Sequence, residues 1–322
     1  MGNPLQPWIE ALRSGEVRAL ARAITCVENR GPDAYELLKT VFPYSGKARV
    51  LGLTGPPGAG KSTLVDQLAH HYRRAKKTVG IVAVDPTSPY TGGAILGDRI
   101  RMQSHHADPG IYIRSMATRG SLGGLAHTTA DVATVMDASG RDVILVETVG
   151  VGQDEIDIVR LADVTIVILV PGMGDDVQTI KAGIMEIADI FVINKSDREG
   201  AERVEREILS MQSLASSRKN GADAWIPPIV KTVASEGKGI EELGAAIEKY
   251  EGYLRQDGRL LAKAAHNWET RLTEMLRDAL LERVVKARFR DGELARCAAE
   301  VAGHKRDPYS LVEELVGAYN KV

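Results

Sequence analysis

Short apolar runs alternate with amphipathic stretches through the middle of this 322-residue chain. The runs are rich in valine and isoleucine, which favour strands, and most are followed by residues at helical spacing. They are ARVLGLTG at 48–55, TVGIVAVD at 78–85, RDVILVET at 141–148, ADVTIVILV at 162–170, ADIFVINK at 188–195 and PPIVKTVA at 227–234. This alternation predicts an α/β domain with a mostly parallel sheet that is covered by helices on both faces.

The two ends of the chain show helical spacing without alternating strands. Apolar residues recur every three or four positions from Trp8 to Val27, and again after Leu254, with charges between them. The apolar side of a helix must be buried, either on the domain or on a second subunit, and the sequence leaves both possibilities open. We predict an N-terminal helical segment at 1–47, a central domain at 48–252 and a C-terminal helical extension at 253–322.

GPPGAGKST, which begins at residue 55, fits the phosphate-binding pattern G-x-x-x-x-G-K-[S/T]. A predicted strand precedes it and a predicted helix follows. Its glycines let consecutive main-chain N–H groups turn toward one point, and the helix adds the positive end of its dipole. Lys61 is then placed to contact the β- and γ-phosphates, and the Ser62 hydroxyl to bind Mg²⁺. The candidate phosphate-binding residues are Gly55, Pro56, Pro57, Gly58, Ala59, Gly60, Lys61, Ser62 and Thr63.

NKSD, at residues 194–197, ends a predicted strand. An aspartate there can accept hydrogen bonds from N1–H and the 2-amino group of guanine. Adenine lacks both donors and would leave the carboxylate unpaired, so the motif favours GTP over ATP. The later segment TVASEGKGI falls where GTPases place a main-chain contact to guanine O6. The candidate base-binding residues are Asn194, Lys195, Asp197, Val233, Ala234 and Ser235.

Two carboxylates stand at the ends of strands that should be buried. Asp85 ends the strand at 78–85, and Glu147 lies at the end of the strand at 141–148. Both are placed to hold Mg²⁺ or its bound waters. Asp98 lies in TSPYTGGAILGDR, a loop of small residues that can order around a γ-phosphate. The candidate metal ligands are Ser62, Asp85, Asp98 and Glu147, and these three acids with Lys61 are also catalytic candidates.

A group that positions the attacking water is harder to find. The best-known GTPases have a glutamine directly after the glycine that here is Gly150, but this chain has Val151, and Gln153 is displaced. The segment VPGMGDDVQTIKAG offers Gln178 and Lys181 at helical spacing, either in an ordinary connection or in a mobile segment that responds to nucleotide or partner. Both are catalytic candidates. We expect slow hydrolysis by the isolated protein and faster hydrolysis when a partner rearranges these segments.

The composition narrows the classes of partner and the cellular compartments that we expect. Lys and Arg number 41 and Asp and Glu 43, and the net charge of −2 offers no electrostatic argument for nucleic acid or a membrane surface. The two cysteines lie far apart, as in a protein with reduced thiols. No apolar run approaches the about 20 residues that a membrane span needs. We expect a bacterial cytoplasmic protein, or an organellar matrix protein whose leader was removed.

Six segments follow one another as in one known family. They are GPPGAGKST, VDPTS, GDRIRM, ETVGVGQDE, PGMGDDVQTIKAGI and NKSD. In this order the chain resembles the MeaB/ArgK-type GTPases, the bacterial relatives of the human protein deficient in cobalamin A-type methylmalonic aciduria. The resemblance is strong over about residues 48–250 and loose in the helical flanks.

This resemblance implies a P-loop domain that hydrolyses GTP to GDP and phosphate with Mg²⁺. It implies a homodimer, often formed through the C-terminal helical extension. The implied partner is an adenosylcobalamin-dependent acyl-CoA mutase of the methylmalonyl-CoA mutase type, whose cofactor loading and protection the GTPase gates. It also implies that Asp85, Asp98 and Glu147 serve the Mg²⁺ and switch network, and that Gln178 and Lys181 lie in an additional switch.

Three other functions compete with this interpretation. A nickel-centre maturation GTPase usually offers a His-rich tract or a Cys/His cluster, which this sequence lacks. A kinase of a periplasmic transport protein needs an acceptor site and a base, and no motif specifies them. A scaffold that binds nucleotide without turnover would tolerate loss of Lys61 or Asp85 without a change in partner function.

Overall fold

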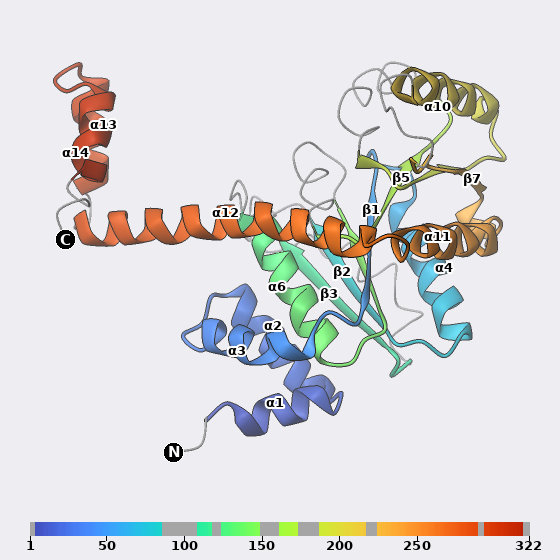
Figure 1. The fold of residues 1–322 in the computed structure, drawn as a ribbon, viewed down its shortest axis with the longest axis horizontal. Coiled ribbons are helices and arrows are strands. Elements are labelled where there is room, and N and C mark those ends of the chain that lie inside the picture. The colour runs from blue at the N-terminus through green and yellow to red at the C-terminus, as the bar shows by residue number, and fades with distance from the viewer. Residues whose placement is uncertain are drawn as a thin grey trace. The chain divides into compact units, whose positions relative to one another are not determined.

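The computed structural model describes residues 4–85, 108–117, 124–148, 161–172, 187–216, 224–288 and 293–317. At its centre lies a seven-stranded sheet in the order β3-β2-β4-β1-β5-β6-β7 (Figure 1). Every neighbouring pair of strands is parallel, so the predicted α/β fold is confirmed. The strands are β1 (Arg49–Thr54), β2 (Val79–Asp85), β3 (Ile111–Ala117), β4 (Val143–Glu147), β5 (Val164–Leu169), β6 (Ile190–Asn194) and β7 (Ile229–Thr232).

The apolar pattern did not predict β3. Its sequence, IYIRSMA, is interrupted by Arg114 and Ser115. β3 lies at the edge of the described sheet, beside β2, where a strand has fewer buried neighbours and tolerates polar residues. Arg114 forms an ion pair with Glu28 of an N-terminal helix, and this pair compensates the charge of a side chain that is largely buried.

Helices cover both faces of the sheet, as predicted (Figure 1). On one face α4 and α11 share a core with β1, β5 and β6. On the other, α1, α2, α3 and α6 pack over β2 and β4, and α10 packs over β5 and β6. The helices are α1 (Gln6–Arg13), α2 (Val17–Glu28), α3 (Ala34–Val41), α4 (Lys61–Arg74), α6 (Gly124–Ala138), α10 (Ala201–Ser216), α11 (Ile240–Leu254), α12 (Arg259–Arg288), α13 (Glu293–Ala302) and α14 (Pro308–Gly317).

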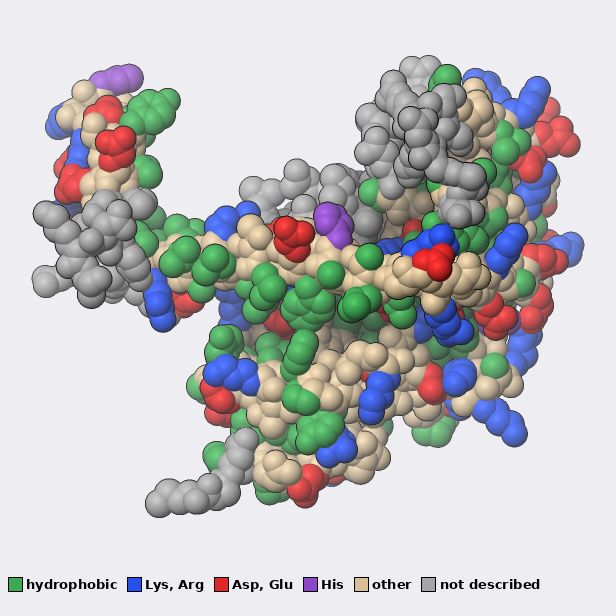
Figure 2. All heavy atoms as spheres, in the orientation of Figure 1, with side chains coloured by type: hydrophobic (Ala, Val, Ile, Leu, Met, Phe, Trp, Pro, Cys, Tyr) green, Lys and Arg blue, Asp and Glu red, His purple; other side chains and the backbone are tan. Residues whose placement is uncertain are grey.

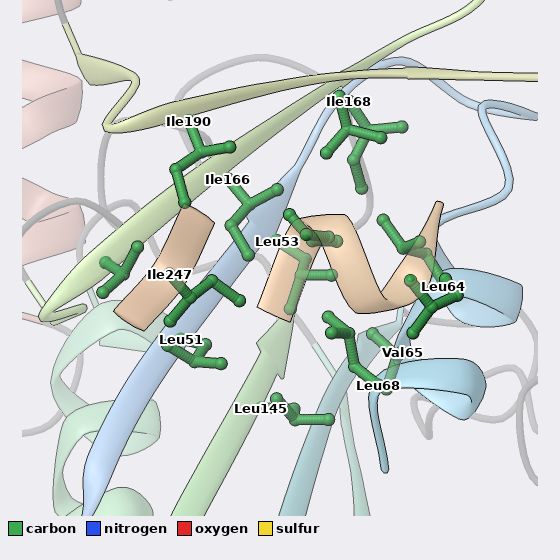
Figure 3. Packing of buried hydrophobic residues seen from close by; sticks show 14 of the residues in the cluster. Leu51, Leu53, Leu64, Val65, Leu68, Leu145, Ile166, Ile168, Ile190 and Ile247 are labelled. Atoms are coloured by element: carbon green, nitrogen blue, oxygen red, sulfur yellow. The ribbon is translucent and has the colours of Figure 1, made fainter. Parts of the chain in front are cut away.

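The core beneath α4 fixes where that helix begins. In Figure 3, Leu51 and Leu53 of β1 lie beside Ile166 of β5, and Leu64 and Leu68 of α4 belong to the same cluster. All five side chains are fully buried. Burial of each stabilises the fold by about 1.5–3 kcal/mol. The first turn of α4 is therefore held firmly over the end of β1, where the phosphate-binding motif lies.

Three aspartates brace the opposite, amino-terminal edge of the sheet. Each stands just before its own strand and accepts a hydrogen bond from a main-chain N–H at, or directly before, the start of a neighbouring strand. The bonds run to Asp142 from the Thr78 N–H, to Asp163 from the Val50 N–H and to Asp189 from the Thr165 N–H, each at 2.8 Å. They satisfy amides near the beginnings of the strands and help to fix the register. The carboxyl edge is left for ligands, as is usual in open parallel sheets.

Lys263 ties the start of α12 to this braced edge. Its Nζ donates to Asp189 Oδ2 at 2.7 Å, to the Asp163 carbonyl at 2.8 Å and to the Tyr250 hydroxyl at 3.1 Å. Burial raises the pKa of the Asp163 carboxyl, against the lowering effects of the Val50 N–H and the Lys263 charge. The beginning of α12 is thus attached to the sheet by an ion pair with several further bonds.

The chain forms two compact units, Met1–Ala265 and His266–Val322, whose boundary falls inside α12. The divisions at 47/48 and 252/253 follow changes in sequence pattern and stay predictions. Within the described ranges, no helix has both the length and the apolar composition that crossing a bilayer requires.

Candidate nucleotide and metal site

The phosphate-binding motif connects the end of β1 to the start of α4, at the carboxyl edge of the sheet. Gly55, Gly58 and Gly60 have φ values of 147°, 75° and 89°, which side chains with a Cβ adopt at a cost. At Gly55 a side chain is also excluded sterically, because a Cβ would lie 2.2 Å from the carbonyl oxygen of Ile168. Gly60 caps α4, so the first N–H groups of that helix point toward the loop.

Lys61 opens α4 and is only 6% exposed. Its Nζ donates to the carbonyl oxygens of Gly55 at 2.8 Å and Pro56 at 3.1 Å. The ammonium group is therefore held against the loop and beside a helix N-terminus, two features that attract phosphate. Among the remaining motif residues, Pro56 and Ala59 are buried, whereas Pro57, Gly58 and Thr63 are exposed to solvent.

Ser62 and Glu147 are 85 positions apart in sequence and meet at this loop. The Ser62 hydroxyl donates to Glu147 Oε1 at 2.7 Å. The parallel register of β1 and β4 places Glu147 level with Leu53, two residues before Gly55. Glu147 is only 4% exposed. A hydroxyl and a carboxylate oxygen are ligands that suit Mg²⁺, so the donor set fits this ion.

Asp85 is the last residue of β2, and β2 pairs with β4. Asp85 and Glu147 therefore both end strands at the carboxyl edge, on neighbouring strands. The other candidates for switch and water chemistry, Asp98, Gln178 and Lys181, lie outside the described residues, as do Val151 and Gln153. Their roles stay predictions.

Asn194 braces the candidate base-binding region, a structural role that the sequence motif alone did not reveal. Its Nδ2 donates to the Ala59 carbonyl in the phosphate loop at 2.8 Å. Its Oδ1 accepts from the Thr232 hydroxyl at 3.0 Å and from the Ala234 N–H at 3.1 Å. Asn194 is only 2% exposed, so these bonds are shielded from water. One amide side chain thus joins the phosphate-loop motif, β7 and the turn that begins at Ala234.

Lys195 and Asp197 extend from the same strand end. Lys195 Nζ donates to the Gly58 carbonyl at 2.8 Å, so its stem crosses from the base motif to the phosphate loop. Its φ of 55° is unusual for a residue with a side chain, and such values concentrate at functional sites. Asp197 is exposed, and its role in base recognition stays a prediction.

The later segment forms a short turn between β7 and α11. Residues Ala234–Glu236 make a 3₁₀ turn, closed by an antiparallel bridge between Val233 and Lys238. Val233 and Ala234 are buried, while Ser235 is exposed. Because the Ala234 N–H donates to Asn194, guanine O6 would have to share this donor or use the neighbouring Ser235 N–H.

A phosphate loop at the end of β1, a buried lysine and a guanine-type motif at the end of β6 define a P-loop GTPase. The sequence model of one family, described as methylmalonyl Co-A mutase-associated GTPase MeaB, matches residues 20–288. The chain belongs to this family, and it hydrolyses GTP.

Similar proteins agree with this assignment. The chain is 49% identical over 313 residues to a Pyrococcus abyssi protein named as a GTPase, with 96% of each chain covered. It is 40% identical over 256 residues to the GTPase ArgK of Escherichia coli, covering 78% of this chain and 77% of that one. It is 33% identical over 298 residues to the mouse mitochondrial methylmalonic aciduria type A homolog, covering 86% and 71%.

A crystal structure resembles the chain along its full length. It is described as that of an LAO/AO transport system kinase, has a TM-score of 0.70 and 28% identity, and the match covers 100% of both chains. The α/β fold described above is thus shared by the two proteins.

Proposed function

We propose that this protein is a Mg²⁺-dependent GTP switch that accompanies an adenosylcobalamin-dependent acyl-CoA mutase. In this role it would gate cofactor loading and protect the mutase from inactivation. The observation that carries the proposal is the site itself, a P-loop joined through Asn194 to a guanine motif, in a member of the mutase-associated GTPase family.

The metal would be held by Ser62 and Glu147, with Asp85 on the neighbouring strand as a further candidate. Asp98 is proposed from its sequence position alone. When bound, Mg²⁺ neutralises charge on the β- and γ-phosphates. Its donor set is supported by the 2.7 Å contact between Ser62 and Glu147 at the start of α4.

The chain's own residues would bind and orient the nucleotide. Lys61 and the N–H groups at the start of α4 would hold the phosphates in line for attack by water and stabilise the charge that develops. Asp197 would select guanine, and Lys195 would keep the base motif at a fixed distance from the phosphate loop through its bond to Gly58.

The partner is proposed from the family. The family description names a methylmalonyl-CoA mutase, and a mouse relative is named for methylmalonic aciduria. The family description does not distinguish among methylmalonyl-CoA, isobutyryl-CoA and ethylmalonyl-CoA mutases as the partner of this chain, so all three are candidates. The protein in the similar crystal structure is called a kinase, but in this chain the guanine motif favours a GTPase.

Stimulation by the mutase tests this role. In single-turnover assays with radiolabelled GTP and Mg²⁺, the isolated chain is expected to hydrolyse slowly and the addition of the mutase to accelerate it. A mutase from an unrelated cobalamin reaction serves as the control partner. Equal, fast rates with and without the acyl-CoA mutase would contradict partner gating while leaving the GTPase assignment intact.

The C-terminal helices are proposed to form a homodimer. In Figure 2, hydrophobic side chains gather along α12. Five of them, at 40–61% exposure, are Leu272, Met275, Leu276, Leu280 and Leu281. An apolar row of this size on a charged helix indicates a protein contact, and a second copy would bury the same row from each chain.

Light scattering on the full chain tests the dimer. The wild type is expected at twice the mass of one chain, and Leu276→Glu combined with Leu280→Glu is expected at the mass of one, because burying two carboxylates in the contact is costly. Leu209→Glu, at an exposed position on α10, is the matched control and should stay dimeric. A wild type that runs as a monomer at all concentrations would contradict the proposal.

A further inference from the structure

The attachment of β4 to β1 continues one residue beyond the end of β4. Thr148, which follows Glu147, donates its N–H to the Leu53 carbonyl at 3.2 Å. Its hydroxyl donates to the hydroxyl of Thr54, also at 3.2 Å. The side chains of Thr148 and Thr54 are 5% and 0% exposed. Two bonds therefore hold the chain to β1 just where β4 has delivered its carboxylate.

The two ends of this hydroxyl pair are attached to the two parts of the site. Thr54 directly precedes Gly55, whose carbonyl accepts from Lys61. Thr148 directly follows Glu147, whose carboxylate accepts from Ser62. The pair thus spans the base of the phosphate loop and the base of the metal-binding carboxylate.

Strand alternation explains why the Glu147 carboxylate faces α4 while the hydroxyl pair lies on the other face of the sheet. Leu145 of β4 belongs to the core beneath α4, and Val146 belongs to the core on the other face. Glu147 follows the orientation of Leu145, and Thr148 follows that of Val146. Thr148 therefore anchors the backbone from behind while Glu147 reaches forward to Ser62.

Because both hydroxyls are buried, the hydrogen bond between them contributes to the stability of the fold. Leaving one buried hydroxyl without its partner destabilises the fold more than removing both hydroxyls does. Without the pair, the Thr148 N–H bond to the Leu53 carbonyl would be the one described bond that holds the chain to β1 directly after Glu147, and the position of the carboxylate would be less restricted.

We propose that Thr148 is a positioning residue for the Glu147 carboxylate and hence for the metal that Glu147 and Ser62 bind. Thr54 is its partner in this role. The inference rests on the proposed Mg²⁺ dependence of the site. It adds a residue, next to the motif acid, whose hydroxyl sets the geometry of the acid without touching nucleotide or metal.

The chain contains a matched control. Thr165 of β5 is also a buried threonine in a central strand, at 0% exposure, and its hydroxyl has no partner among the described residues. Thr165→Val removes the same atoms as Thr148→Val without breaking a described bond. It should leave Mg²⁺ dependence unchanged and should not lower the unfolding midpoint.

The test measures binding of a fluorescent GDP analogue across a Mg²⁺ titration, together with urea unfolding of the full chain. Thr148→Val and Thr54→Val are each expected to raise the half-saturating Mg²⁺ concentration about fivefold, the equivalent of one hydrogen bond. Affinity for the analogue in EDTA should not change. Thr148→Ser, which keeps the hydroxyl, should restore the wild-type value.

The double variant Thr54→Val, Thr148→Val separates positioning from simple stability. Its unfolding midpoint should recover relative to either single variant, because no unpaired hydroxyl remains buried. Its Mg²⁺ requirement should stay raised about fivefold, as in the single variants. Recovery of both quantities together would show a structural pair only and overturn the proposal.

The experiment distinguishes failure of the proposed Mg²⁺ site from failure of the proposed role of Thr148. If the wild type binds the analogue independently of Mg²⁺, the metal assignment fails and the role of Thr148 fails with it. If the wild type depends on Mg²⁺ but Thr148→Val, Thr54→Val and Thr165→Val all match it, only the positioning role is overturned.

Discussion

Lys61→Ala is expected to lower the rate of GTP hydrolysis by about 10²–10³-fold, the usual effect of removing one preorganised group that stabilises developing charge. The structure gives the reason. The Lys61 ammonium group is buried, lies at the N-terminus of α4 and is held by the Gly55 and Pro56 carbonyls. No other residue of the loop carries a positive charge. Single-turnover hydrolysis at saturating GTP measures the effect on chemistry.

A second measurement guards against loss of the fold. Lys61→Ala should unfold in urea with the same slope as the wild type, because the surface exposed on unfolding is unchanged. Lys249→Ala, at an exposed position of α11, is the charge-matched control and should hydrolyse GTP like the wild type. A Lys61→Ala variant that folds and retains more than about a tenth of the wild-type rate would contradict the role of Lys61, given the size of such effects.

Asp197→Asn is expected to convert the preference for guanine into a preference for xanthine. Guanine presents N–H donors at N1 and C2, which a carboxylate accepts, whereas xanthine presents a carbonyl at C2. The asparagine amide can donate to that carbonyl but cannot accept both guanine bonds. A site built around hydrogen bonds discriminates by up to about 10⁴–10⁵. Because Asp197 is exposed, we expect a smaller loss of GDP affinity, about 10²–10³-fold.

Competition between labelled GDP and unlabelled GDP, XDP or ADP measures this exchange. The variant should bind XDP more tightly than GDP. ADP should not displace labelled GDP from either the wild type or the variant. Glu199→Gln removes a carboxylate two positions further on and controls for the loss of negative charge. If Asp197→Asn bound GDP as the wild type does, the NKSD segment would not be the base-recognition motif.

The phosphate-loop motif and most of the strands could be predicted from local sequence. GPPGAGKST needs particular residues at particular places, since Gly55 has no room for a Cβ and Gly60 must cap α4 at positive φ. Strands such as ADVTIVILV could be predicted because a strand that is buried on both faces must be apolar at nearly every position. IYIRSMA could not, because an edge strand can carry an arginine whose partner, Glu28, lies 86 positions away.

Contacts between residues that are far apart in the sequence could not be predicted from it. The motif NKSD indicates guanine, but its letters do not show that Asn194 reaches Ala59, Thr232 and Ala234 at once. The hydroxyl pair of Thr54 and Thr148 depends on the register of β1 against β4, which is set by packing of the whole sheet. No spacing in the sequence reveals that register.

Local patterns of residue types were enough to predict the fold class, the phosphate loop, the preference for guanine and the family, because each depends on residues at short, regular spacing. Folding brings together the side chains that meet at the site: Ser62 with Glu147, Asn194 with the phosphate loop, and Thr54 with Thr148. These contacts join strands and loops that are 85, 135 and 94 positions apart. Their geometry follows from parallel strand order and from the burial that holds α4 over β1, which only the folded chain provides.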